Sequence, residues 1–237
     1  GNGMSGDTFY PDSAGVGNHD IVYHYYHIVS NTLSGTIPVF EDDFGSDLGW
    51  TGYGADWERA QATASAGCSG TQDPNTDNTV TNDDMIIGNY IGGCYTNSMG
   101  NTVWLTSPVI DCSALTNCAI DFYSHSGVES NSFDHLYIEA YDGTSWQNVY
   151  SNSGSLSESS WTNWNYNVSA YADGNANFQV RFGVGPTDGS VTYKGWNIDD
   201  FKVIGDGTIT TIDTLCDFTT TYTTTVNNSP SPTFTFI

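Results

Sequence analysis

The stretch LYIEAYDGTSWQNVY, residues 136–150, contains the signals that decide the fold class. Apolar and polar residues alternate on both sides of Asp142-Gly143, a dipeptide that favours the tight turn of a hairpin. The segment is therefore predicted to form two antiparallel strands joined at that turn. A helix would instead need apolar residues at intervals of three and four, and the stretch does not have them.

Strand signals continue along the whole chain, whereas helix signals are almost absent. No run of ten residues carries apolar side chains at the helical period. Short apolar or alternating runs, bounded by Gly, Asn, Asp and Ser, are found at 21–29, 103–106, 119–124, 135–141, 146–150, 178–183 and 201–204. The pattern predicts an all-β protein built as an antiparallel β-sandwich.

The charge of the chain excludes several classes of partner. The 237 residues include Lys+Arg 4 and Asp+Glu 27, which gives a formal net charge of −23. Binding to nucleic acid is not expected, because neutralising phosphates requires a basic face. Anionic membrane surfaces are disfavoured for the same reason, and no run is long enough for membrane insertion. Aromatic residues, at 14%, are too frequent for a disordered acidic chain.

The termini and the cysteines indicate a secreted protein. The sequence starts at GNGMSG without an initiator Met, and we expect a mature, processed, extracellular product. Five cysteines in such a chain favour two disulfides and one unpaired thiol, although five buried thiols stay an alternative. Cys112 and Cys118 bracket a short loop between two strand-like runs, and Cys68 with Cys94 is the natural second pair. Cys216 is then expected to be a free thiol or to form an intermolecular disulfide. No C-x-x-C pair suggests structural zinc.

Three regions follow one another along the chain. Residues 1–38 form an N-terminal extension with one strand, 39–205 a compact body, and 206–237 a threonine-rich C-terminal extension. Threonine favours strands, so the sequence predicts strand-forming N- and C-terminal extensions on both sides of the sandwich.

The body resembles a known family in five short stretches that occur in the family's order. They are FEDDFGSDLGW (40–50), ADWERA (55–60), LTSPVIDCS (105–113), DHLYIEAYDGTSW (134–146) and YKGWNIDDFKVIG (193–205). They are similar to the MAM-like jelly-roll modules of secreted bacterial proteins, also called choice-of-anchor J or cleaved-adhesin-type domains. The resemblance implies a jelly-roll sandwich whose first and last strands, near 40–44 and 198–203, lie side by side. It also implies a non-catalytic role in adhesion, anchoring or carbohydrate contact.

The same resemblance implies a structural Ca²⁺ between the first and last strands. The acidic residues there are Glu41, Asp43, Asp199 and Asp200, and Ca²⁺ prefers six to eight oxygen ligands. Gly45 departs from the family pattern, which usually has Glu at that position. The alternative is that these acids cap turns and face solvent. The acidic stretch 73–84 lacks the spacing of a calcium loop and is expected to be a solvated loop.

The last predicted strand of the body raises a question of charge burial. Adjacent aspartates at 199 and 200 are costly in a strand unless a cation or hydrogen-bond donors satisfy them. Strict alternation predicts two faces, one with Trp196, Ile198 and Asp200 and the other with Asn197, Asp199 and Phe201.

Aromatic residues at 161–166, WTNWNY, are a candidate platform for surface glycans, with core packing as the alternative for each tryptophan. Two N-x-S/T sequons, at Asn167 and Asn227, are candidate glycosylation sites. The threonine-rich tail is a candidate for O-glycosylation.

No catalytic residues are predicted. The chain has no G-x-S-x-G elbow, and no motif places a serine beside His125 or His135. His24 and His27 are three apart in a strand-like run, so they point to opposite faces and cannot share a metal. A two-carboxylate glycosidase stays open as a remote alternative, because acids are plentiful.

The extensions decide between two functional hypotheses. An apolar strand at 21–29 is an aggregation hazard unless it is paired, and the C-terminal tail is also strand-forming. The leading hypothesis is a subunit of a bacterial surface filament, a homopolymer assembled by β-strand exchange. The alternative is an adhesion or carbohydrate-binding module of a larger secreted protein. The residues predicted to mediate assembly are Ile21, Tyr23, Tyr25, Ile28, Phe234, Phe236 and Ile237.

Overall fold

The protein is described by a computed structural model that covers residues 17–54, 56–79 and 83–226. Residues 33–209 form one compact unit, and the described flanks, 17–32 and 210–226, belong to a second unit. No helix among these residues is long and apolar enough to cross a membrane.

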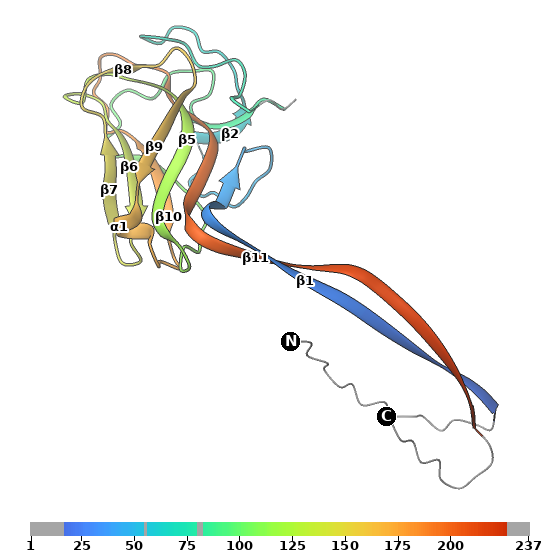
Figure 1. The fold of residues 1–237 in the computed structure, drawn as a ribbon. Helices are drawn as coiled ribbons and strands as arrows, with labels where there is room; N and C mark the ends of the chain where they lie inside the picture. Colours follow the sequence, from blue (N-terminus) through green and yellow to red (C-terminus); the bar gives the residue numbers. More distant parts are fainter. Residues whose placement is uncertain (1–16, 55, 80–82, 227–237) are drawn as a thin grey trace. The chain divides into compact units, whose positions relative to one another are not determined.

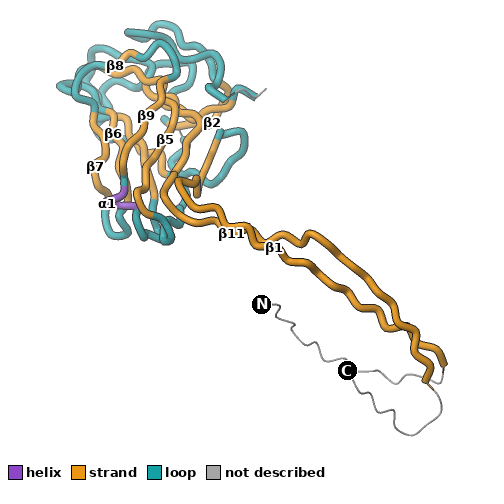
Figure 2. The backbone as a smooth tube through the Cα atoms, in the orientation of Figure 1, coloured by secondary structure: helices purple, strands orange, loops and turns teal. Residues whose placement is uncertain are grey.

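The described chain is almost entirely strand and loop, with one single-turn helix (Figure 2). The elements are β1 (Gly17–Asp42), β2 (Trp57–Gln61), β3 (Met85–Asn89), β4 (Val103–Thr106), β5 (Thr116–Val128), β6 (Leu136–Tyr141), β7 (Trp146–Ser151), β8 (Leu156–Ser157), β9 (Thr162–Asn167), α1 (Ser169–Ala172), β10 (Gln179–Val184) and β11 (Gly195–Val226).

Two antiparallel sheets make up the body (Figure 1). The larger sheet has the order β2-β3-β11-β5-β8, with β9 also paired to β5 and β1 to β11. The smaller sheet has the order β4-β10-β6-β7. Neighbours in space are mostly not neighbours in sequence, as in a jelly roll, where successive strands alternate between sheets. The predicted all-β, antiparallel jelly-roll sandwich is confirmed.

The hairpin predicted at 136–150 is present as β6 and β7. Tyr141 is paired with Trp146, and the carboxylate of Asp142 accepts hydrogen bonds from the backbone N–H groups of Thr144 (2.8 Å) and Ser145 (2.9 Å). Gly143 has a positive φ of 96°, a conformation that glycine adopts without a Cβ clash. The turn is therefore set by the dipeptide that the sequence singled out.

Aromatic rings fill the space between the two sheets. Phe182 of the smaller sheet lies 5.2 Å from the ring of Phe122 and 5.4 Å from that of Trp196, both on the larger sheet. Buried indole N–H groups find acceptors, as polar groups in a core require. Trp196 donates to the Ser124 hydroxyl (3.0 Å), and Trp50 donates to Asp42 (2.8 Å).

A β-bulge in β11 overturns the strict alternation predicted for this strand. The register against β5 shifts between Asp199 and Lys202, and Asp200 has a positive φ of 50°. Beyond one extra residue, each side chain of the strand lies on the opposite face of the sheet from the one that strict alternation predicts. Phe201 consequently enters the core with Trp196, and its ring lies 5.9 Å from that of Phe182.

The two adjacent aspartates are satisfied by hydrogen-bond donors from the loop that joins β2 and β3. Asp199 accepts the backbone N–H of Asn78 (2.7 Å) and of Thr79 (3.1 Å). Asp200 accepts the amide of Asn78 (2.7 Å) and the hydroxyl of Thr79 (2.5 Å). These bonds fasten the end of the loop to the bulge of β11.

The cysteines differ in part from the prediction. Cys68 and Cys94 form a disulfide that joins the loop after β2 to the loop after β3. The predicted pairing of Cys112 with Cys118 is wrong: both are buried free thiols. Burial raises the pKa of the Cys112 thiol to about 11, and it also raises that of Cys118. Disulfide formation requires a thiolate, which this environment disfavours.

The predicted strand in the N-terminal extension is part of β1, which pairs with β11. Side-chain hydrogen bonds join Thr32 to Thr210 (3.4 Å) and Ser34 to Thr208 (3.1 Å), so the two strands run antiparallel. Strand β1 contains four of the residues predicted to mediate assembly, Ile21, Tyr23, Tyr25 and Ile28. The structure describes only the backbone at these positions. Phe234, Phe236 and Ile237 lie outside the described residues.

We predict that Asp199 gives the domain a stability that falls as pH rises. Burial raises the pKa of this carboxyl from 3.8 to about 7 in the folded state. The folded state therefore holds the proton more tightly than the unfolded state, and the stabilisation is lost as pH rises from about 4 through 7. Relative to Asp199→Asn, the wild type should gain on the order of 2 kcal/mol between pH 7.5 and pH 5.

Urea denaturation at several pH values measures this difference. Burial lowers the pKa of His125 to about 4, so this residue makes the stability fall as pH falls, in the wild type and in Asp199→Asn alike. The difference in stability between the two proteins therefore reports on Asp199. Asp111→Asn, a change of an exposed carboxylate, is the matched control and should follow the wild type. Parallel curves for the wild type and Asp199→Asn would contradict the prediction.

Candidate functional site

A cleft of about 590 Å³ opens between two loops at one end of the larger sheet. One wall belongs to the loop between β2 and β3, and the other to the segment that leads into β9. His125 of β5 lies between them. The lining residues are Ala64, Gly70, Thr71, Gln72, Asp73, Pro74, Asn75, Thr76, His125, Ser159, Ser160 and Trp161.

Trp161 is the aromatic member of the cleft. Its ring is half-buried, and its N–H donates to the backbone carbonyl of Thr76 (3.1 Å) across the two walls. The rings of His125 and Trp161 lie in an edge-to-face arrangement with a centroid distance of 5.6 Å. The indole is thus held by two contacts while it still lines an open space.

The rim of the cleft is polar but uncharged. Amide and hydroxyl side chains exposed there are those of Gln72, Asn75, Thr76, Ser159 and Ser160. An aromatic ring flanked by amides and hydroxyls offers both an apolar surface and hydrogen-bond donors and acceptors. This is the chemistry that a ligand with apolar faces and hydroxyl groups requires.

Glu158 fixes the wall that carries Trp161. One carboxylate oxygen accepts three hydrogen bonds, from the hydroxyl of Ser124 and from the hydroxyl and backbone N–H of Ser126. The other oxygen accepts the indole N–H of Trp164 (3.0 Å). All four donors lie on β5 and β9, so the carboxylate ties this segment to the sheet.

Asp73 fixes the opposite wall. It is almost fully buried, and its carboxylate accepts the amide of Asn197 (2.6 Å) and the backbone N–H of Gly92 (3.2 Å). Burial raises the pKa of Asp73 to about 6, although its hydrogen bonds to Asn197 and Ser65 act in the opposite direction. Its hydrogen-bond partners, Asn197, Gly92 and Ser65, do not line the cleft, so we assign Asp73 the role of supporting the loop.

The floor of the cleft rests on a buried lysine. Lys194 is fully buried, and its ammonium group contacts Nδ1 of His125. Burial, and after it the charge of Lys194, lower the pKa of His125 to about 4. The imidazole is consequently neutral at physiological pH, and a ring with so low a pKa is a weak general base.

The carboxylates predicted to bind calcium do not form one site. Glu41 forms an ion pair with Lys202 (3.1 Å), and Asp43 accepts the backbone N–H of Gly45 (3.1 Å). Asp199 and Asp200 face the β2–β3 loop, whose donors occupy their oxygens. The alternative, that these acids cap turns and face solvent, fits the exposed Asp43, whereas Asp199 is buried and bonded to the β2–β3 loop.

A different acidic cluster lies in the part of the chain that the structure describes. Carboxylate oxygens of Glu129, Asp134 and Asp188 lie within 4.8 Å of one another. Asp134 is fully buried and accepts the Tyr95 hydroxyl. Oε2 of Glu129 is buried, with no hydrogen-bond partner among the described residues. Burial and the two neighbouring carboxylates raise the pKa of Glu129. These three acids could hold a metal ion.

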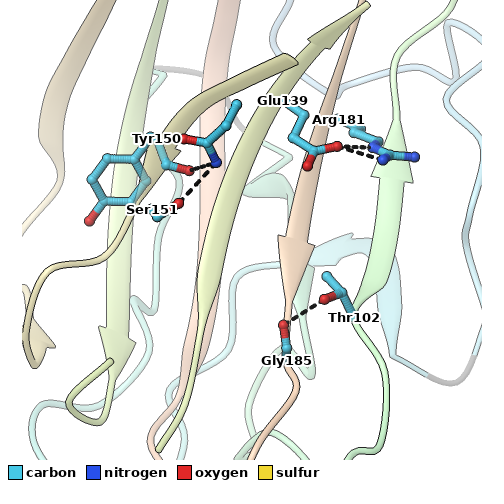
Figure 3. A network of polar contacts seen from close by, with 7 residues as sticks. Thr102, Glu139, Tyr150, Ser151, Arg181 and Gly185 are labelled. Atoms are coloured by element: carbon cyan, nitrogen blue, oxygen red, sulfur yellow. Dashed lines mark hydrogen bonds and ion pairs between the residues drawn. The ribbon is translucent and has the colours of Figure 1, made fainter. Parts of the chain in front are cut away.

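The outer face of the smaller sheet carries a second group of aromatic residues, but their ring faces are occupied. The guanidinium of Arg181 lies 4.0 Å from the ring centre of Trp104 and 4.2 Å from that of Trp146. Arg181 also donates to Glu139 (2.8 Å; Figure 3). This cation–π stack stabilises the sheet and leaves less ring surface for a ligand.

The aromatic segment predicted as a platform is divided between surface and core. Trp164 and Tyr166 pack against the hydrophobic core, whereas Trp161 lines the cleft. The sequon residue Asn167 is exposed at the end of β9, and Asn227 lies outside the described residues. Glycosylation at either position stays a prediction.

Sequence reasoning missed the other components of the cleft. Lys194 and the loop around Thr71 have no recognisable motif, and His125 was considered only as part of a triad. The one available signal was the rarity of lysine in this chain: Lys194 is one of only four basic residues and directly precedes a predicted strand, although lysine is rarely buried.

No protein-family model and no curated protein matches the chain. Among solved structures, it is similar to the N-terminal CBM22-1–GH10 modules of the Clostridium thermocellum endo-1,4-β-D-xylanase 10B, complexed with xylohexaose. The TM-score is 0.40 and the identity 14%, over 72% of this chain and 28% of that one. The chain therefore spans less than a third of the xylanase structure.

Two smaller domains are also similar. The K3 cleaved adhesin domain of Lys-gingipain from Porphyromonas gingivalis gives a TM-score of 0.37 at 13% identity, over 70% of this chain and 98% of that one. The N-terminal cellulose-binding domain of Cellulomonas fimi β-1,4-glucanase C gives 0.33 at 11%, over 75% and 99%. Likeness at this level does not indicate a function by itself, and the MAM-like resemblance stays a prediction.

Proposed function

We propose that the protein is an extracellular, non-catalytic binding domain that holds a carbohydrate in the cleft beside Trp161. The observation that carries the proposal is the placement of this half-buried indole in a cleft of about 590 Å³ with an uncharged amide and hydroxyl rim. The apolar face of a sugar ring stacks on an indole, while its hydroxyl groups bond to such a rim.

The charges of the protein favour a neutral glycan. All four basic residues lie in the described chain, and none is left to bind an anion in the cleft. Arg59 donates to the carbonyl of Phe44, Arg181 and Lys202 pair with glutamates, and Lys194 is buried. With a net charge of −23, the chain repels uronates and sulfated sugars at a distance.

We expect Trp161→Ala to weaken binding to the preferred neutral polysaccharide by about 10-fold or more, because the stacking surface is removed. Affinity electrophoresis against xylan, laminarin, mannan and hydroxyethyl cellulose identifies the ligand, and calorimetry measures the loss. Trp161→Phe keeps a ring and should retain part of the affinity.

Phe133→Ala is the matched control, since this exposed aromatic residue (48% exposed) does not line the cleft. It should bind like the wild type. Absence of retardation by every neutral polysaccharide, or stronger binding to alginate and heparin, would refute the proposed function.

We propose further that a structural calcium ion is held by Glu129, Asp134 and Asp188, at a different place from the site that the sequence predicted. The orphaned Oε2 of Glu129 and the mutual repulsion of three carboxylates are the features that a cation would relieve. The ion would join the ends of β5 and β10 to the start of β6, and its role would be structural.

Calcium added to protein dialysed against a chelator should raise the melting temperature. At 100 times the dissociation constant, the gain is about 2.7 kcal/mol, or about 5–10 °C for a domain of this size. Glu129→Gln should abolish the rise, whereas Asp111→Asn should keep it. An equal melting temperature with and without calcium in the wild type would exclude the site.

Self-association through the extensions is a second candidate function. Beyond Asp206, β11 pairs with β1 in the part of the chain that the structure describes. A two-stranded ribbon is marginally stable alone, and its outer edges offer unpaired N–H and C=O groups to another copy. These edges support the strand-exchange hypothesis. In the single chain, β1 and β11 pair with each other.

Mass photometry of the full chain over a range of concentrations tests this second candidate. Multimers should form, and a version limited to 33–209 should stay monomeric and retain glycan binding. That version keeps every buried core residue of the described chain, from Ile37 to Val203, so we expect it to fold. A full chain that is monomeric at all concentrations would rule out assembly.

A further inference from the structure

The ammonium group of Lys194 is unusual because it is buried without a carboxylate partner at contact distance. Its hydrogen-bond partners are the hydroxyl of Thr71 (3.0 Å), the carbonyl of Gln72 (3.2 Å), the carbonyl of Glu158 and Nδ1 of His125. An isolated buried charge is costly, and burial lowers the pKa of this lysine to about 8. Four neutral acceptors surround it instead.

These four acceptors all belong to the cleft or to its walls. Thr71, Gln72 and His125 line the cavity, and Glu158 immediately precedes Ser159 on the opposite wall. The aliphatic part of the lysine lies against β5, where a Cβ on Gly127 would approach its Cγ to 2.9 Å. A single side chain therefore bridges both walls and the floor.

The contact with His125 also determines the state of the imidazole ring. An ammonium group has only donors, so Nδ1 of His125 must accept and carries no proton. The ring proton of the neutral imidazole is then on Nε2. His125 is neutral in this environment, since burial and the adjacent charge of Lys194 both oppose its protonation.

We propose that Lys194 is the positioning residue of the cleft: it holds the two walls together and fixes His125 as the Nε2–H tautomer, so that the floor offers a neutral donor to a ligand hydroxyl oxygen. This inference rests on the proposed function and adds a specificity element to it. A donor that is never charged in the physiological range suits a neutral sugar, because it recognises an oxygen without attracting anions.

Histidine side-chain ¹⁵N NMR of the full-length protein tests the tautomer directly. His125 should show a protonated Nε2 and an unprotonated Nδ1 at pH 7, and it should stay neutral down to about pH 4. The loss of its signals in His125→Gln assigns them among the five histidines. An Nδ1–H tautomer, or a doubly protonated ring at pH 7, would overturn the proposal even if no variant could be made.

Lys194→Met keeps the aliphatic stem and removes the donors. In this variant we expect a mixture of the two neutral tautomers of His125 and a rise of its pKa towards the ordinary value. We also expect the affinity for laminarin or xylan, whichever of the two the wild type binds, to fall about 10-fold. A purely structural role would lower the melting temperature without moving the tautomer signals.

Lys202→Met is the matched control, because this lysine pairs with Glu41 and has no contact with the cleft. It should leave both the tautomer and the affinity unchanged. Unchanged tautomer signals or unchanged affinity in Lys194→Met would contradict the positioning role of Lys194. Failure of the wild type to bind any neutral glycan would instead refute the carbohydrate proposal. The NMR experiment would still test whether Lys194 donates to Nδ1 of His125.

Discussion

The body depends on the burial of one cluster of aromatic rings between its two sheets. Phe182 reaches from the smaller sheet into a group formed by Phe122, Trp196 and Phe201 on the larger one. Rings of this size bury about 150–250 Å² each, which makes them the main apolar contribution to such a core. Strand β11 supplies two of the four rings, so its register determines what both sheets can bury.

The start of the same strand also positions polar residues on which the cleft depends. Lys194 directly precedes β11, two residues before Trp196, and Asn197, whose amide donates to Asp73, directly follows Trp196. Because Trp196 is locked in the core, its polar neighbours are held in place without further support. The hydrophobic core thus supplies the rigidity that a preorganised binding site requires.

Local patterns in the sequence were sufficient to predict the fold class and the β6–β7 hairpin. Alternation and the Asp142-Gly143 turn act within a few residues, so they can be read from the sequence. The bulge at Asp200 could not be predicted, because the side chains that donate hydrogen bonds to Asp200, those of Asn78 and Thr79, lie far away in the chain. The phase of Phe201 was therefore predicted wrongly.

The candidate site was less predictable for a similar reason. Its residues come from four separate segments, and neither Lys194 nor His125 belongs to a motif. The aromatic segment at 161–166 suggested a platform, but choosing Trp161 over Trp164 required the packing. The acidic cluster joins Glu129 and Asp134 to the distant Asp188, whereas the family resemblance implied a site at other acids, between the first and last strands.

The loop between β2 and β3 is fastened to β11 on both sides of its cleft-lining tip. Lys194 and Asn197 hold it at 71–73, and the two aspartates of the bulge hold it at 78–79. Pro74, Asn75 and Thr76, between these anchors, line the cleft. The side chains of Asn75 and Thr76 are exposed, so we expect substitutions there to change the lining of the proposed carbohydrate-binding cleft at little cost to folding. The architecture thus separates residues of the proposed site that can vary from the anchors that hold them.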